Sequence, residues 1–189
     1  MKKITFLLTF LMFYLHNTNS YAVIHNKYTP YVGFDYIFNN IDIKEYTSKN
    51  NAANIRIGSD YNKYFSTEIF INQSDSYKKH KLNNFHKLSY KSYGLDVFTY
   101  LPLGCEQKFN ILATAGIGEY IFNNKIKNQK HKKEHGLGYR FGAGLKYKIN
   151  KTWQIRYITR YIKFDKTDTQ KYSIEQNIGI EYHFNNLGK

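Results

Sequence analysis

Residues 138–161 read GYRFGAGLKYKINKTWQIRYITRY, and this stretch decides the fold. From Tyr139 to Ile149 every second residue is apolar, and the residues between them are glycine, lysine or arginine. The polar residues 150–152 follow, and the alternation resumes at Trp153. A period of two is typical of β-strands whose two faces differ. The stretch therefore predicts two antiparallel strands joined by a tight turn.

The same alternation recurs along the rest of the chain. It predicts eight strands, at residues 32–38, 53–61, 65–72, 93–101, 109–118, 139–149, 153–161 and 174–184. Each is about ten residues long, which is the length of a strand that crosses a bilayer at a tilt of about 45°.

The connections between these strands alternate in length. Short turns are expected near residues 62–63, 102–107 and 150–152. Longer polar loops are expected near residues 39–52, 74–87, 123–136 and 165–171. Short turns at one end and long loops at the other are typical of a membrane barrel. We therefore predict an all-β fold, an eight-stranded antiparallel up-and-down transmembrane β-barrel, as a single domain over residues 23–189.

Composition excludes several other classes of protein. The chain has 189 residues, with 28 Lys and Arg against 14 Asp and Glu, and a formal charge of +14. Its negative mean hydropathy excludes a polytopic helical membrane protein. An aromatic content of 18 % argues against disorder, and a single Cys excludes an internal disulfide framework.

The first 22 residues have the pattern of a secretory signal peptide. Lys2 and Lys3 precede a 12-residue apolar run, residues 4–15, and Ser20-Tyr21-Ala22 fits the small-x-small rule for cleavage. The run is too short to span a bilayer. A buried N-terminal helix is the alternative. We expect cleavage after Ala22 and export to the bacterial envelope.

We assign the charged face of the strands to the lumen of the barrel. The residues expected there are six acids and six bases, namely Asp35, Asp60, Glu68, Asp96, Glu175, Glu181, Arg56, Arg140, Lys146, Lys148, Arg156 and Arg160. A narrow lumen needs this balance because an unpaired buried charge is costly, whereas a solvated surface does not. The alternative is a soluble barrel whose charged face meets water.

One residue fits this assignment poorly. Continued alternation places Glu119 on the lipid face of its strand. A carboxylate there is tolerable only if the position lies above the bilayer, so we expect Glu119 outside the apolar region.

The segments 138–147 and 150–157 resemble the Gly-x-Gly strand, tight turn, Trp and basic-aromatic strand of small eight-stranded outer-membrane barrels. This family includes the transmembrane domain of outer membrane protein A, the opacity proteins and porin-like surface antigens, and the resemblance covers residues 23–189. It implies a Gram-negative outer membrane, both termini periplasmic, and contact with membrane lipid and lipopolysaccharide.

The end of the last strand adds a second likeness. Tyr182-His183-Phe184 is similar to the terminal aromatic signal that the barrel assembly machinery recognises, which implies that machinery as a partner. The family usually stops at this Phe, whereas here residues 185–189 follow it.

The excess positive charge lies in two of the expected long loops. These two loops contain ten lysines and only two acidic residues, Asp75 and Glu134. The basic patch consists of Lys78, Lys79, Lys81, Lys125, Lys127, Lys130, Lys132 and Lys133. Such a surface attracts anionic partners, such as lipopolysaccharide phosphates, host sulfated glycans or acidic proteins. A merely solvated lysine-rich surface is the alternative. Nucleic acid is excluded as a partner because the chain is exported and lacks a recognition fold.

No cofactor or metal site is predicted. Gly116-x-Gly118 lies inside an expected strand with no helix after it, so it does not fit a dinucleotide site. The pairs His80/His86 and His131/His135 lie in loops without carboxylates at matched spacing.

No catalytic residue is predicted either. The best nucleophilic constellation is Ser76 with His80 and Glu134, and nothing around it resembles a lipid-modifying barrel hydrolase. Cys105, in an expected short turn, is more consistent with an inert thiol than with a nucleophile. We therefore expect a non-enzymatic surface barrel whose basic loops mediate adhesion or anion binding. The alternatives are a low-conductance pore and, third, a lipid A-modifying enzyme.

Overall fold

The computed structural model describes residues 28–43, 46–81, 84–104, 107–126, 132–165, 167 and 170–184. At residues 43, 46–48, 77–81, 84–87, 124–126 and 132 it describes the backbone without the side chain. The expected signal peptide, residues 1–22, lies outside the described residues, as do Cys105 and the tail 185–189.

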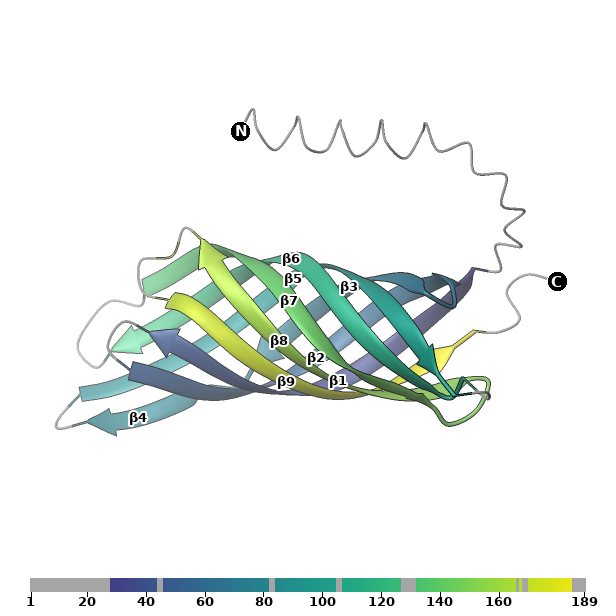
Figure 1. Cartoon of the computed structure of the whole chain (residues 1–189). Coiled ribbons are helices and arrows are strands. Elements are labelled where there is room, and N and C mark those ends of the chain that lie inside the picture. Colours follow the sequence, from purple (N-terminus) through teal and green to yellow (C-terminus); the bar gives the residue numbers. More distant parts are fainter. Residues whose placement is uncertain are drawn as a thin grey trace, which may run out of the picture.

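The described chain forms one closed antiparallel sheet (Figure 1). Its strands are β1 (Thr29–Ile43), β2 (Tyr46–Asn62), β3 (Phe65–Ser74), β4 (Tyr77–Lys81), β5 (Asn84–Leu103), β6 (Phe109–Ile126), β7 (Lys132–Lys148), β8 (Trp153–Asp165) and β9 (Gln170–His183). Neighbours in sequence pair with each other except β3 and β4, β1 pairs with β9, and β3 pairs with β5 to close the wall. The short β4 pairs with the start of β5 beyond the end of β3, so the wall itself has eight strands. The predicted fold class is confirmed.

The two faces of this sheet differ in polarity. On β2, Ile55 and Ile57 are 62 % and 65 % exposed, whereas Arg56 between them is 1 % exposed. Every strand of the wall has apolar side chains outside, and every one except β6 has at least one charged side chain inside. This is opposite to a soluble barrel, which turns its apolar face inward. The outer surface is therefore built to meet lipid, and the soluble alternative is wrong.

The barrel has two unlike ends (Figure 1). At the short-turn end lie the start of β1, the end of β9 and the turns that join β2 to β3 and β7 to β8. The connections from β1 to β2, β6 to β7 and β8 to β9 lie at the other, long-loop end, where β4 extends the wall. No helix in the described part of the chain is long and apolar enough to cross a membrane.

The expected long loops are mostly strand. β1 and β2 pair as far as Ile43 and Tyr46, so much of the predicted loop 39–52 belongs to the sheet. Similarly, β6 and β7 pair as far as Asn124 and Lys132. The predicted loop lengths were wrong because the strands continue past the apolar part of the wall, where the outward residues become polar.

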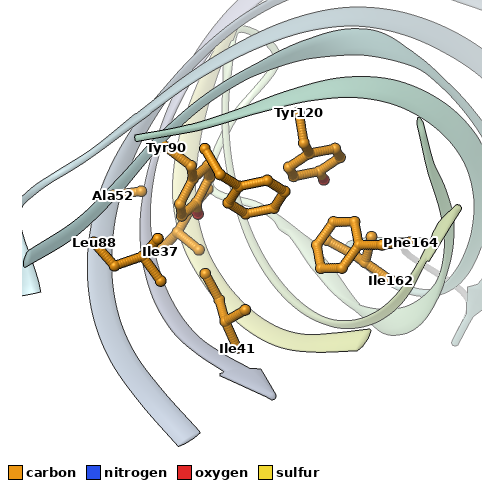
Figure 2. Packing of buried hydrophobic residues seen from close by; sticks show 9 residues of the cluster. Ile37, Ile41, Ala52, Leu88, Tyr90, Tyr120, Ile162 and Phe164 are labelled. Carbon is orange, nitrogen blue, oxygen red and sulfur yellow. The ribbon is translucent and has the colours of Figure 1, made fainter. Parts of the chain in front are cut away.

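An apolar cluster fills the lumen at the long-loop end. Aromatic and aliphatic side chains from five strands of the wall converge there (Figure 2). We call it the apolar plug, and its members are Ile37, Ile41, Ala52, Leu88, Tyr90, Tyr120, Phe122, Ile162 and Phe164. Tyr120 and Phe164 meet edge to face, with ring centroids 5.0 Å apart. A second, smaller cluster of Phe98, Tyr100, Leu112 and Ile158 lies in the lumen nearer the short-turn end.

Gly144 allows β7 and β8 to pack closely at the level of the second cluster. A Cβ atom at this position would overlap the carbonyl oxygen of Tyr157 and crowd the Cα atom of Ile158. Both are backbone atoms of β8, so they cannot move aside without disturbing the sheet. The glycine is therefore required by a close approach of two strands.

We predict that Gly144→Val lowers the free energy of unfolding by about 1–3 kcal/mol, the usual cost of overpacking. Ala143→Val is the control, because Ala143 is the next residue and faces outward. Urea titration in detergent measures the free energy of unfolding of both variants, and the heat-modifiable gel mobility reports the folded fraction at each urea concentration. Equal midpoints for the two variants would contradict the prediction.

Candidate functional site

The centre of the lumen holds an arginine–carboxylate cluster that joins strands from all around the wall. Arg156 on β8 approaches Asp35 of β1 at 3.0 Å and Glu68 of β3 at 2.8 Å. Arg56 on β2 approaches Asp35 at 2.9 Å and Glu181 of β9 at 2.7 Å. All five side chains are almost completely buried. They are charge-assisted contacts at hydrogen-bond distance, which are the strong kind.

A second pair of arginines continues the cluster toward the plug. Arg140 on β7 lies 3.0 Å from Asp96 of β5 and 3.8 Å from Glu175 of β9. Arg160 on β8 lies 3.2 Å from Asp96 and 3.7 Å from Glu68. The four arginines meet five carboxylates, those of Asp35, Glu68, Asp96, Glu175 and Glu181, and Lys146, which lies 2.5 Å from Glu181, supplies the fifth positive charge. The middle of the lumen is therefore neutral overall.

The second pair is less well satisfied than the first. None of the three guanidinium nitrogens of Arg160 has a hydrogen-bond partner among the described residues, and neither carboxylate oxygen of Glu175 has one. Arg140 is better held, because it donates to Tyr120 Oη at 2.5 Å and lies 3.8 Å above the ring of Phe70. Such a cation–π contact is stronger when it is desolvated. The arginines are thus unequal in what their loss would cost.

Toward the short-turn end a smaller group contains a lysine and a histidine. Lys146 Nζ lies 2.5 Å from Glu181 Oε1. The ring of His183 lies between two carboxylates, 3.3 Å from Asp60 and 3.2 Å from Glu181, and stacks on Tyr31. The sequence placed His183 on the inward face without assigning it to the lumen network. The only indication in the sequence was that His183 falls on the same inward face of its strand as Glu181.

Ten of the twelve residues expected in the lumen are buried there. The other two, Asp60 and Lys148, are half-buried and line the mouth of the short-turn end. Phe70, an apolar residue on the polar face of its strand, lies against Arg140. The side chains that the sequence pattern left unexplained thus belong to the same packed interior.

Most of the expected basic patch lies where only the backbone is described. Lys127 and Lys130 are outside the described residues, and the side chains of Lys78, Lys79, Lys81, Lys125 and Lys132 are not described. The backbone register pairs Lys78 with Lys87, and Lys87 with Lys125, so three lysines on β4, β5 and β6 lie in one row. Lys133 on β7 is exposed.

The residues considered for catalysis are not assembled by the described structure. Ser76 is exposed between β3 and β4, whereas Glu134 is buried on β7, with β5 and β6 between them. The side chain of His80 is not described. Among the described residues no group of three or more His, Cys, Asp or Glu could hold a metal ion.

Glu119 lies outward on β6, as expected, and has two polar neighbours. Tyr93 Oη donates to Glu119 Oε2 at 2.6 Å, and His135 Nδ1 lies 3.0 Å from Glu119 Oε1. Lys91, two residues beyond Tyr93, is exposed. The outward face therefore becomes polar at this level. That Glu119 lies above the bilayer stays a prediction.

The aromatic residues expected to signal assembly lie at the short-turn end. Tyr182 meets Trp153 edge to face at 5.0 Å and Phe184 at 5.1 Å. The amide of Phe184 donates to the carbonyl of Pro30 at 2.9 Å, which ties the end of β9 to the start of β1. These rings form part of an aromatic band at one edge of the outer surface, as in membrane barrels.

A closed sheet with an apolar outside and a charged, filled inside defines an integral membrane β-barrel. The chain belongs to the family of the outer membrane protein beta-barrel domain, whose model matches residues 6–186. It is therefore a protein of the Gram-negative outer membrane, in contact with its lipid and lipopolysaccharide. Among curated protein sequences none matches the chain significantly.

Solved structures share this fold at low sequence identity. Neisserial surface protein A is 15 % identical with a TM-score of 0.67, over 82 % of this chain and 97 % of that chain. Ail of Yersinia pestis, in complex with the heparin analogue sucrose octasulfate, is 13 % identical with a TM-score of 0.60, over 83 % and 99 %. The N-terminal barrel domain of OprF of Pseudomonas aeruginosa is 13 % identical with a TM-score of 0.54, over 82 % and 97 %.

We predict that the arginines of the centre differ in their cost of removal. Arg156→Met leaves Asp35 with Arg56 alone and strands the carboxylate of Glu68, whose other guanidinium neighbours lie 3.7 and 3.9 Å away. It should cost about 3–5 kcal/mol of unfolding free energy. Arg160→Met should cost clearly less, because this guanidinium lacks hydrogen bonds to the described residues. Urea unfolding in lipid or detergent measures both.

The pairing itself is tested by a double variant. Adding Glu68→Gln to Arg156→Met removes the stranded charge, so part of the lost stability should return. Equal costs for Arg156→Met and Arg160→Met, together with no recovery in the double variant, would refute the hierarchy.

Proposed function

We propose that the protein is a non-conducting surface barrel whose long-loop end binds anionic partners through lysines. The observation that carries the proposal is the row formed by Lys78, Lys87 and Lys125, which the backbone register places side by side on three neighbouring strands. Like charges in one row repel each other, and a polyanion that lies across the row removes this repulsion. The formal charge of +14 agrees with an anionic partner.

The direction of the barrel follows from the lengths of its connections. Outer-membrane barrels have short periplasmic turns and longer extracellular loops. The long-loop end of this barrel, where β4 extends the wall, is then the outer end, and both termini lie on the periplasmic side. In this orientation the row of lysines faces lipopolysaccharide and host surfaces.

Sulfated glycans are the ligand class that we favour for this row. Ail of Yersinia pestis, which shares the fold, has been solved in complex with a heparin analogue. A sulfated glycan presents repeated charges at regular spacing, which suits lysines on successive strands better than a single phosphate does. Adhesion to host cells through such glycans is the biological role that we propose.

The filled lumen supports a closed barrel over a pore. The apolar plug occupies the lumen at one end and the arginine–carboxylate cluster occupies its centre. An eight-stranded barrel is only wide enough for side chains to fill it. The third hypothesis, a lipid A-modifying enzyme, gains no support from Ser76, which is exposed between β3 and β4, and Glu134, which is buried on β7.

We also propose the route by which the chain reaches the membrane. Residues 1–22 act as a cleaved signal peptide, and Tyr182 and Phe184 act as the signal for the barrel assembly machinery. The position of both aromatic side chains at the end of β9 supports this role, because that end pairs with the start of β1 when the wall closes.

We predict that the triple variant Lys78→Glu, Lys87→Glu, Lys125→Glu, which reverses every charge of the row, binds heparin at least about tenfold more weakly than the wild-type barrel, since three attractions become repulsions. Wild-type binding should weaken as salt is raised, because exposed charges are screened. Surface plasmon resonance on barrels in nanodiscs measures both effects.

The matched control has the same change of charge at the other end. Lys63→Glu, Lys108→Glu, Lys151→Glu alters the short-turn end and should leave heparin binding nearly unchanged. Equal losses in the two triple variants would show that total charge, rather than the row of lysines, attracts the glycan and would contradict the proposal.

We predict that the purified barrel gives no discrete conductance steps in planar bilayers, because both the plug and the charge cluster obstruct the lumen. A porin in the same bilayers is the positive control. Reproducible unit conductance from the wild-type barrel would reinstate the pore.

A further inference from the structure

A cavity of about 610 Å³ opens at the short-turn end. It is lined by residues from the ends of five strands, from the turn between β7 and β8, and from the position just before β6, including Asp60, Lys108, Lys148, Lys151, Gln154 and His183. A smaller space of about 40 Å³ shares Asp60, Lys148 and Gln154 with it and reaches buried Tyr100 and Lys146. The volume lies in the range of small-molecule sites.

The rim of this cavity is held in place before any ligand arrives. Asn150 Oδ1 accepts hydrogen bonds from the amides of Thr152 and Trp153, both at 2.8 Å. The amide of His183 donates to the carbonyl of Thr152 at 2.8 Å, which ties the turn to the end of β9. A preformed rim lowers the entropic cost of binding.

The charges around the cavity are of two kinds. Three ammonium groups, those of Lys108, Lys148 and Lys151, line it. The acidic component is Asp60, whose Oδ2 lies 3.3 Å from the ring of His183. The ammonium groups suit an anionic group of a ligand, and this mixture differs from the neutral centre of the lumen.

Two buried acceptors in the same cavity point to a ligand that also donates hydrogen bonds. Asp60 Oδ1 and Gln154 Oε1 have no hydrogen-bond partner among the described residues. Lys146 Nζ lies 4.0 Å from Asp60 Oδ1, which is an ion-pair distance and too long for a hydrogen bond. Gln154 is only 6 % exposed, so its amide is largely shielded from solvent. Buried polar atoms are normally satisfied, and a ligand with ammonium or amide hydrogens would satisfy both. A simple anion has no hydrogen to offer them.

We propose that this cavity binds a zwitterionic ligand, an amino acid or the end of a short peptide. Its carboxylate lies against the lysines, foremost Lys148, which lines both spaces. Its ammonium group lies against Asp60 and the amide oxygen of Gln154. The site is separate from the row of lysines at the long-loop end, so neither proposal depends on the other.

The test is to titrate small-molecule probes into the folded barrel in nanodiscs and to measure their binding by isothermal calorimetry and by NMR. D-alanyl-D-alanine and glycine are the zwitterionic probes, and acetate and ethylamine are the single-function probes. We expect saturable binding of a zwitterion at least about tenfold tighter than of acetate, since each end of the ligand adds a charge-assisted contact. Tighter binding of the dipeptide identifies a peptide end as the natural ligand, and tighter binding of glycine identifies a free amino acid.

Variants locate the binding. Lys148→Met and Asp60→Asn should each weaken it about tenfold, and Lys148→Arg should retain it. Lys91→Met, at the other end of the barrel, is the control and should bind as the wild type does. Heat-modifiable mobility establishes that each variant is folded.

Three results would overturn the proposal. The first is equal affinity for acetate and the zwitterions, which means an adventitious ion only. The second is no saturable binding of either zwitterion. The third is that the folded Lys148→Met and Asp60→Asn barrels both bind like the wild type.

Discussion

Closure of the sheet by the pairing of β3 with β5 is the constraint from which the rest of the structure follows. In lipid an unpaired backbone N–H or C=O group costs several kcal/mol, and an open edge would expose a row of them. Pairing Phe65–Gln73 with Lys91–Thr99 leaves the wall without an open edge at that level. The closed wall then encloses a lumen that only side chains fill.

Two kinds of side chain, charged and apolar, fill successive parts of the lumen along the barrel axis. Four arginines, Lys146 and five carboxylates occupy the centre, where their charges cancel, and the apolar plug occupies the long-loop end. A guanidinium is large and offers several donors, so Arg156 contacts Asp35 and Glu68 at once and links three strands. Glycine at places such as Gly144 brings the strands close enough for this filling. The interior is thus a packed core that is built from charges.

The sequence predicts this architecture well wherever the two faces of a strand differ. Alternation of apolar and polar residues located all eight strands of the wall, and the balance of charges correctly predicted which face of the strands lines the lumen. It failed beyond the apolar band, because there the pattern inverts: Asn40 and Asp42 lie outward while Ile41 is buried. Ion pairs were beyond its reach, since Arg156 and Glu68 are 88 positions apart and only the register of the closed wall joins them. His183 was missed for the same reason.

The two ends of the barrel differ in how they adjoin the central charges. At the long-loop end the apolar plug lies between the arginine–carboxylate cluster and the row of lysines. At the short-turn end, by contrast, Lys148 and Asp60 continue directly into Lys146, Glu181 and the arginines behind them. A ligand in that cavity would therefore act on the same ion pairs that hold the centre together. Binding at the long-loop end involves only the surface of the protein, whereas binding at the short-turn end involves its charged core.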